Sequence, residues 1–291
     1  MHRSQTTRRP PSLTLAAAVA LASAAMSAAA QPAAAARPAN PCLDATARAQ
    51  LLCPDLVMRK PFGLQLDPLV NPGRLVLRAG NSIDSVGLGP AELHGVRSGR
   101  YLMRARQRIY RRGGGRIGID TRARLFFKLI PGQSRYWKFL HAARFDLFRV
   151  DSSGRIGTRV RRGPKVSYCL RDLSHTGRRR PRSPARRVYP ACNTRSGTRR
   201  VTLGTSVGWS DVYPPTYPEQ WIDVTGLRGC FSYRHTADPL NGIYESNELN
   251  NSASVTVRLP YRDGRQRCPS PPEPAPPATV PQTGGGTTPG Y

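Results

Sequence analysis

Histidine and cysteine, the side chains that most often bind transition metals, are few and widely spaced in this sequence of 291 residues. Beyond the first 30 residues the two closest histidines, His141 and His175, are 34 positions apart. The cysteines lack the C-x-x-C spacing with nearby histidines that is typical of zinc sites. Zinc is therefore not expected, although distant histidines can converge in a fold. The four histidines are His94, His141, His175 and His235.

The cysteines are better explained as disulfides. Their number is six, and an even number in an exported chain is typical of a disulfide framework. Six cysteines allow 15 pairings, and the sequence does not choose among them. Our preferred pairing joins neighbours along the chain, namely Cys42–Cys53, Cys169–Cys192 and Cys230–Cys268.

Arginine is the most abundant charged residue. The chain has 45 Lys+Arg against 17 Asp+Glu, which gives a formal net charge of +28. Residues 171–200 hold ten arginines and one acid, Asp172. This segment is either a solvated loop closed by Cys169–Cys192 or a surface that binds anions. The candidate anion-binding residues are Arg178, Arg179, Arg180, Arg182, Arg186 and Arg187.

Both ends of the chain differ in composition from its middle. Residues 1–30 combine three arginines, an apolar stretch and Ala28-Ala29-Ala30, which together predict a signal peptide. An N-terminal membrane anchor is the alternative. We expect residues 31–40 to be an Ala/Pro linker and the Pro-rich residues 269–291 to be a disordered tail. A single domain then occupies residues 41–268, in an exported chain with no transmembrane segment after the signal peptide.

The elements that position these residues are predicted to be strands. With 27 glycines and 28 prolines the chain is too interrupted for a helical bundle, and no segment predicts a helix of more than three turns. Short runs of β-branched and aromatic residues lie between turn residues, which favours an all-β fold, a single disulfide-braced β-sandwich with long loops. The predicted strands include residues 75–77, 108–110, 124–130, 144–150, 165–170, 220–224, 229–235 and 253–259.

Several segments resemble the catalytic domain of the lysyl oxidase family, in family order over roughly residues 53–260. They are QRIY at 107–110, KVSYCLRD at 165–172, GWSDVY at 208–213, QWIDVT at 220–225 and YESNELNN at 244–251. The resemblance implies an exported copper amine oxidase of lysyl oxidase-type fold, which oxidises peptidyl lysine amines to aldehydes and reduces oxygen to hydrogen peroxide. It also implies a quinone cofactor formed by Lys165 and an oxidised Tyr213.

The copper positions of the family are altered here. The resemblance places the family's His-x-His-x-His run at Ser134, Tyr136 and Lys138. Imidazole suits Cu(II), whereas a hydroxyl, a phenol and an ammonium group do not. Because the quinone needs copper to form, both cofactors are doubtful in this chain, and Lys165 and Tyr213 should stay unmodified.

Our leading functional prediction is therefore a catalytically degenerate, exported family member, a binding or structural protein of the cell envelope or exterior. Its basic surface should repel lysine-rich substrates and attract an anionic envelope polymer or extracellular polyanion. One alternative is an active copper amine oxidase with rebuilt metal ligands, acting on peptidyl lysine. Another is a β-sandwich adhesion module. The oligomeric state stays open.

The resemblance further implies a structural calcium site. Its ligands would be Asp55, the carbonyl of Leu56, Glu245, Asn247, Asn250 and Asn251. Carboxylate, amide and carbonyl oxygens are the ligands that calcium prefers. The alternative is a connection between strands in which the paired asparagines only occupy a turn.

Overall fold

The computed structural model describes residues 37–176, 180–262, 264 and 266–270. The predicted signal peptide, most of the linker and the tail from residue 271 lie outside this range, as do Arg178 and Arg179. The all-β prediction is confirmed: the described chain consists of strands and one six-residue helix, α1 (Ala45–Gln50). In the described residues no helix is long and apolar enough to cross a membrane.

The largest sheet has eight antiparallel strands. Its central strand β6 pairs with β5 and β8, and the shorter β1 and β7 also pair with β6. In order the main path is β12 (Ser167–Tyr168), β9 (Arg135–Leu140), β8 (Arg124–Leu129), β6 (Leu102–Arg111), β5 (Ala91–Arg97) and β14 (Arg200–Thr205), with β1 at Leu51–Leu52 and β7 at Arg116–Ile119.

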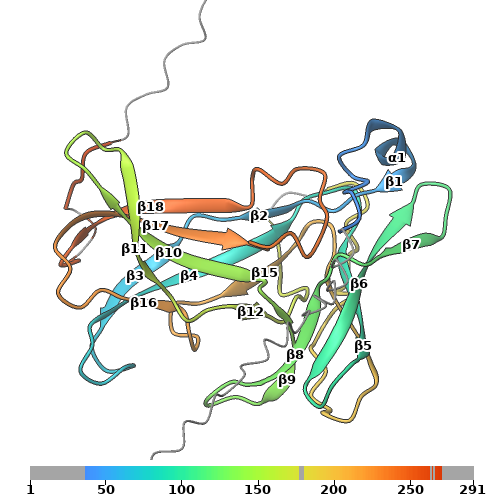
Figure 1. The fold of residues 1–291 in the computed structure, drawn as a ribbon, viewed down its shortest axis with the longest axis horizontal. Helices are drawn as coiled ribbons and strands as arrows, with labels where there is room; N and C mark the ends of the chain where they lie inside the picture. The colour runs from blue at the N-terminus through green and yellow to red at the C-terminus, as the bar shows by residue number, and fades with distance from the viewer. Residues whose placement is uncertain (1–36, 177–179, 263, 265, 271–291) are drawn as a thin grey trace, which may run out of the picture. The chain divides into compact units, whose positions relative to one another are not determined.

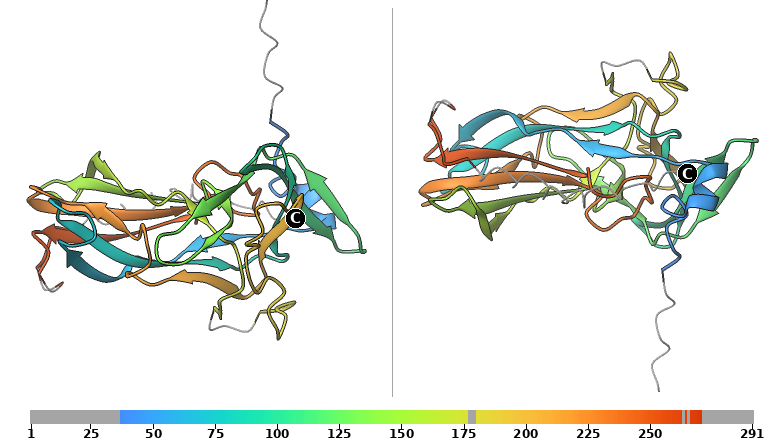
Figure 2. Two further views of the ribbon diagram at one scale, coloured as in Figure 1. Left: turned by 90° about the horizontal axis from the view of Figure 1, so that it is seen from below. Right: turned by 90° about the horizontal axis from the view of Figure 1, so that it is seen from above.

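Two further sheets lie face to face (Figures 1 and 2). One has the order β11 (Ile156–Arg162), β10 (Ala143–Val150), β17 (Gly229–Ala237) and β18 (Ser252–Leu259). The other has the order β13 (Ser174–His175), β15 (Trp209–Tyr213), β4 (Val76–Ser85) and β16 (Trp221–Asp223), with β2 (Leu56–Met58) and β3 (Phe62–Asp67) also paired to β4.

The core lies between these two sheets and continues into the largest sheet, which contributes residues such as Leu93 and Leu125. All ten residues of β4 are buried, as expected for a central strand covered on both faces. From β10, Phe145 and Leu147 are fully buried, and the side chains of Leu77, Ile222 and Phe231 belong to the same apolar cluster. The alternating apolar residues Phe145 and Leu147 of β10 thus face the opposite sheet.

One predicted strand is mostly wrong. Of residues 165–170 only Ser167–Tyr168 pair as a strand, with β9. Beyond them the backbone forms other hydrogen bonds: the amide N–H of Cys169 donates to the Tyr213 hydroxyl (3.3 Å), and the carbonyl of Leu170 accepts from Gly204 (3.2 Å). Residues 167–170 are all buried, which therefore reflects contacts on several sides rather than an alternating sheet position.

The preferred disulfide pairing is confirmed. The bonds are Cys42–Cys53, Cys169–Cys192 and Cys230–Cys268. The second bond closes most of the arginine-rich segment, in which only the two-residue strand β13 precedes β14 among the described residues. This segment is therefore a long loop, as one of the two interpretations predicted.

Candidate functional site

Lysine and tyrosine side chains from different elements form a buried cluster near the ends of β9 and β15. The Nζ atom of Lys165 lies 4.4 Å from the ring centroid of Tyr213, 4.5 Å from that of Tyr217 and 4.6 Å from that of Tyr168. With Tyr136 and Lys138 of β9, these residues are called the lysine–tyrosine cluster below. The two residues that the resemblance implies as a quinone pair are therefore in contact.

Local backbone features bring Lys165 into this position. Gly163 follows β11 and passes so close to Trp221 that a Cβ atom there would lie 2.6 Å from the Trp221 carbonyl oxygen. Only glycine allows this approach, and it directs the next residues inward. Tyr213 ends β15, and the turn after it is held by Arg78, which donates to the carbonyls of Pro215 (2.6 Å) and Tyr217 (2.9 Å).

Two of the three altered copper positions belong to the cluster. Ser134 lies in the exposed turn before β9. Tyr136 is half-buried, and its hydroxyl hydrogen-bonds with the Tyr217 hydroxyl. Lys138 is fully buried, with its Nζ atom 5.1 Å from the Tyr136 ring centroid and 5.7 Å from that of Tyr217. A serine hydroxyl, a hydrogen-bonded phenol and an ammonium group do not fit copper.

Both buried lysines have pKa values below the usual value for a lysine. The Nζ atoms of Lys138 and Lys165 have no hydrogen-bond partner. Burial lowers the pKa of Lys138 to about 8. Burial, followed by repulsion from the Lys138 charge, lowers the pKa of Lys165 well below its usual value.

Several polar groups beside the cluster were missed by sequence reasoning. Asp211 on β15 is fully buried without an ion-pair partner among the described residues, and burial raises its pKa to about 8. Nε of Arg171 and Oε1 of Gln220 are also buried without partners. In contrast, Lys128 forms an ion pair with Glu219. These unpaired atoms mark a polar site surrounded by apolar rings.

A signal for this site was present in the composition. The sequence has only four lysines among its 45 basic residues. Three of them, Lys128, Lys138 and Lys165, meet in this region, whereas Lys60 is exposed. The rare occurrence of lysine in this arginine-rich chain therefore could have indicated the candidate site.

The four histidines do not converge. His94 lies on β5, His141 between β9 and β10, His175 on β13 and His235 on β17. His235 stacks on Phe145 with ring centroids 3.7 Å apart, and burial lowers its pKa to about 3. No group of three or more His, Cys, Asp or Glu side chains that could hold a metal ion is found in the part of the chain that the structure describes.

Most of the residues predicted to bind calcium do converge. The buried carboxylate of Glu245 accepts hydrogen bonds from the backbone N–H of Leu56 and from Asn251 Nδ2 (2.8 Å). Asn250 Nδ2 donates to Asp55 (2.8 Å). The amide oxygens of Asn250 and Asn251 are buried without partners, and burial raises the pKa of Glu245 well above its usual value. Unpaired oxygens beside a buried carboxyl group fit a bound cation.

Asn247 stands apart from this group. It is exposed, and its side-chain oxygen accepts from the backbone N–H of Leu249 (3.0 Å) in a local turn. Glu248, which sequence reasoning missed, lies closer: one of its oxygens accepts from Asn40 (2.8 Å), and the other is buried and unpaired. Glu248 lies within the same acidic and amide-rich segment as Glu245 and Asn251, and this position in the sequence could have indicated it as a candidate ligand.

In the arginine-rich loop, some arginine side chains bind backbone carbonyls and others are exposed to solvent. Arg180 donates to the carbonyl of Val86 (2.8 Å) and is half-buried. Arg187 donates to the carbonyl of Leu173 (2.9 Å). Arg182 and Arg186 are exposed, as is most of the Arg187 side chain. The loop therefore presents charge to solvent while some of its arginines hold it in place.

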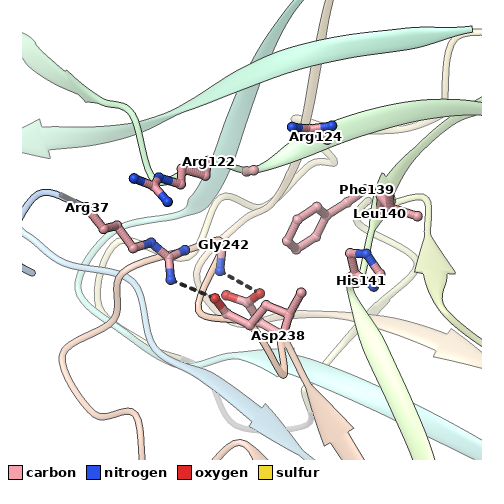
Figure 3. A pocket seen from close by; sticks show the side chains of 10 residues that line it. Arg37, Arg122, Arg124, Phe139, Leu140, His141, Asp238 and Gly242 are labelled. Carbon is pink, nitrogen blue, oxygen red and sulfur yellow. Dashed lines mark hydrogen bonds between the residues drawn. The ribbon is translucent and has the colours of Figure 1, made fainter. Parts of the chain in front are cut away.

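A second basic feature is a cavity of about 460 Å³ between β8, β9 and the loop after β17. Figure 3 shows Arg122, Arg124 and His141 around it, with Asp238 below. Asp238 accepts from the backbone N–H groups of Gly242 (2.8 Å) and Ile243 (2.6 Å), and burial raises its pKa to about 7.

The backbone around this cavity is strained. Arg122 (φ 63°), His141 (φ 62°) and Asp238 (φ 39°) are three of the six non-glycine residues with positive φ among the described residues. Such residues are uncommon and gather at functional sites. The cavity is therefore a second candidate site, of basic character.

Comparison with known proteins agrees with the sequence motifs. No curated protein matches the chain. The family model described as lysyl oxidase matches residues 94–268, which include the whole lysine–tyrosine cluster and Glu245 to Asn251 but not Asp55 and Leu56. A match over more than half of the chain shows that this protein belongs to the lysyl oxidase family.

Proposed function

We propose that this chain is a lysyl oxidase-family domain that does not carry out copper-dependent amine oxidation and instead binds anionic polymers outside the cytoplasm. The observation that carries the proposal is the residue set at the family's metal positions. Lys138 has no lone pair to offer a metal while it is protonated, and the Tyr136 hydroxyl is engaged with Tyr217. Without a fitting metal site, the amine of Lys165 and the phenol of Tyr213 stay separate side chains.

The charge of the chain supports an anionic partner. A formal net charge of +28 attracts polyanions and repels lysine-rich proteins, which are the substrates expected of an active family member. The exposed arginines of the loop and the basic cavity of Figure 3 offer two places for carboxylate, sulfate or phosphate groups. An acidic polymer of the envelope or an extracellular polyanion has this chemistry.

Two features support a site of action outside the cytoplasm. Three disulfides are typical of proteins in oxidising compartments, and residues 1–30 have the composition of a signal peptide. Calcium is abundant in such surroundings. We propose that Glu245, Asp55 and the amide oxygens of Asn250 and Asn251 hold one calcium ion, which would tie the N-terminal segment to the connection before β18.

The test of lost oxidase chemistry uses the purified, exported full-length chain after incubation with Cu(II) in air. We expect no stoichiometric copper, an unmodified intact mass and no peroxide release from amine substrates. Stoichiometric copper with a cross-link between Lys165 and Tyr213 would overturn the proposal and establish an oxidase with rebuilt ligands.

Polymer binding is tested separately with a sulfated polysaccharide at low and moderate salt. The variant R122Q/R124Q removes two charges from the basic cavity, and R155Q/R161Q removes two charges from exposed positions on and beside β11 as a matched control. We expect the cavity variant to bind about tenfold more weakly at low salt, since two exposed ion pairs contribute about 1.4 kcal/mol together. Equal losses in both variants would show that only total charge matters, and no binding by the wild type would refute the function.

A further inference from the structure

The amine of Lys165 is a buried group that the proposed function does not use. It has no exposed surface and no hydrogen-bond partner, and it lies within 4.6 Å of three aromatic ring centroids. Contacts with rings favour the ammonium form, but burial outweighs them, and the pKa of Lys165 falls well below its ordinary value. The lowered pKa raises the share of neutral amine, whose lone pair a nucleophile requires.

A neighbouring cation strengthens this effect. Lys138 is the largest cause after burial for the lowered pKa of Lys165. A second positive charge beside a desolvated lysine is one of the ways in which proteins activate an amine nucleophile. The other charged groups that act on Lys165 are Glu219 and Asp211, which oppose the effect, and Lys128, which adds to it.

Asp211 supplies a matching acid. Burial raises its pKa to about 8, so the carboxyl group is mostly protonated at pH 7. It interacts electrostatically with both Lys165 and Lys138, and the neighbouring Tyr213 side chain opposes the rise in its pKa. An amine with a lowered pKa beside a largely protonated carboxylic acid favours acid-assisted addition to a carbonyl group.

The geometry points to an activity distinct from amine oxidation: we propose that Lys165 captures small carbonyl compounds that carry a carboxylate, as a covalent imine. The nitrogen adds to the carbonyl carbon and gives a carbinolamine. Its hydroxyl group then leaves as water, with the two hydrogens lost from nitrogen balancing that water molecule. The carbon–oxygen bonds are replaced by a carbon–nitrogen double bond, and no oxidant or reductant is needed.

The preference for a carboxylate follows from the other unpaired groups. Nζ of Lys138 and Nε of Arg171 are buried donors without acceptors, and both act electrostatically on Asp211. A small carboxylate would satisfy such donors. The carbonyl group would then face Lys165, with the rings of Tyr168 and Tyr213 excluding larger compounds.

Entry requires movement of the outer part of the cluster. Tyr217 covers Lys165, and its hydroxyl is bonded to that of Tyr136; both tyrosines are only half-buried. Glu219, which ends the turn, has a positive φ of 68° and is held by its ion pair with Lys128. We expect the Tyr136–Tyr217 contact to open for the ligand.

The test incubates the full-length exported protein at pH 7 with glyoxylate and cyanoborohydride, which reduces an imine to a stable carboxymethyl-amine. Peptide mapping then assigns the label among only four lysines. We expect Lys165 to be labelled at least on the order of tenfold faster than exposed Lys60, since an ordinary lysine is almost wholly protonated at pH 7. Label on Lys60 with none on Lys165 would overturn the proposal.

Variants and a second probe refine this result. K165M should lose the label while K60M keeps it, and Y217F should speed labelling because the covering hydrogen bond is gone. Should K165M fail to fold, mapping of the wild type and Y217F still decides the question. Propanal has no carboxylate, so we expect it to label Lys165 no faster than glyoxylate does. Faster labelling by propanal would refute the preference for a carboxylate. The Cu(II) incubation that tests the proposed function gives its result independently of these labelling experiments, so the two proposals can fail separately.

Discussion

Replacing Lys138 by methionine should stabilise the protein, although the residue is fully buried in the candidate site. Burial lowers the pKa of Lys138 from 10.5 to about 8, and each unit corresponds to 1.36 kcal/mol. This lowering of the Lys138 pKa therefore represents roughly 3 kcal/mol of destabilisation at pH 7. The contacts with the Tyr136 and Tyr217 rings offset about 0.5 kcal/mol each. Methionine fills similar space without a charge, so we expect K138M to gain about 2 kcal/mol.

The sign of the pH dependence provides the sharper measurement. Because the folded-state pKa of this base is depressed, the full penalty is present below pH 8 and disappears as pH rises from 8 to 10.5. Urea unfolding of wild type and K138M at pH 7 and pH 10 should therefore show a difference that shrinks to below about 1 kcal/mol. K60M serves as the exposed control. A K138M protein that is no more stable than wild type at pH 7, or a difference independent of pH, would refute the reasoning.

The same substitution has a second consequence. Without the Lys138 charge the pKa of Lys165 rises, because repulsion from that charge is, after burial, the main cause that lowers this pKa. Reductive labelling of Lys165 by glyoxylate should then slow at pH 7 and recover at higher pH, whereas a purely structural Lys138 would leave the pH profile unchanged. Greater stability with slower capture is the combination we expect.

Three further predictions concern other groups. H235F should remove a buried base whose pKa falls from 6.5 to about 3, so the wild type should lose about 2 kcal/mol more than H235F between pH 7 and pH 5, measured by urea unfolding. Calcium at about 100 times its Kd should stabilise the wild type by about 2.7 kcal/mol in thermal unfolding, and E245Q should lose most of that gain; equal responses would exclude the proposed site. The variant S134H/Y136H/K138H should bind stoichiometric copper where the wild type binds none, and a copper-free variant would show that residues outside this run prevent binding.

Much of the fold could be predicted from local patterns. Alternation in residue type identified β10 and β18, and in β18 the buried residues Val257 and Leu259 keep the period of two. In β10 Asp146 is buried as well as Phe145 and Leu147, so burial there is not confined to one face. Pairing of sequence neighbours was enough for the disulfides, because the paired cysteines lie only 11, 23 and 38 positions apart in the sequence. The segment 165–170 was misjudged since its burial comes from a disulfide and from Tyr213, neither of which has a periodic signal.

The site was only half predictable. Motifs indicated Lys165 and Tyr213, and the period of two places Asp211 on the same face of β15 as Tyr213. Nothing local showed that Tyr217 would lie beside them, because that contact depends on how the turn after β15 folds. Similarly, Asn247 fits a ligand pattern by type, yet its oxygen is used in its own turn. Spacing describes which chemistry is available, whereas tertiary contacts decide which atoms remain unpaired.

Those unpaired atoms bear on why lysine occurs at positions 138 and 165. Arginine cannot replace lysine there, because its charge is permanent and would remain buried. A purely structural requirement would be better met by an apolar residue of similar size, since removing a buried, unpartnered amine relieves its desolvation. Two such amines side by side destabilise each other through repulsion. Their presence thus lowers stability for a reason that packing does not provide, and the capacity to exist as a neutral amine is the property that only lysine brings to this cluster.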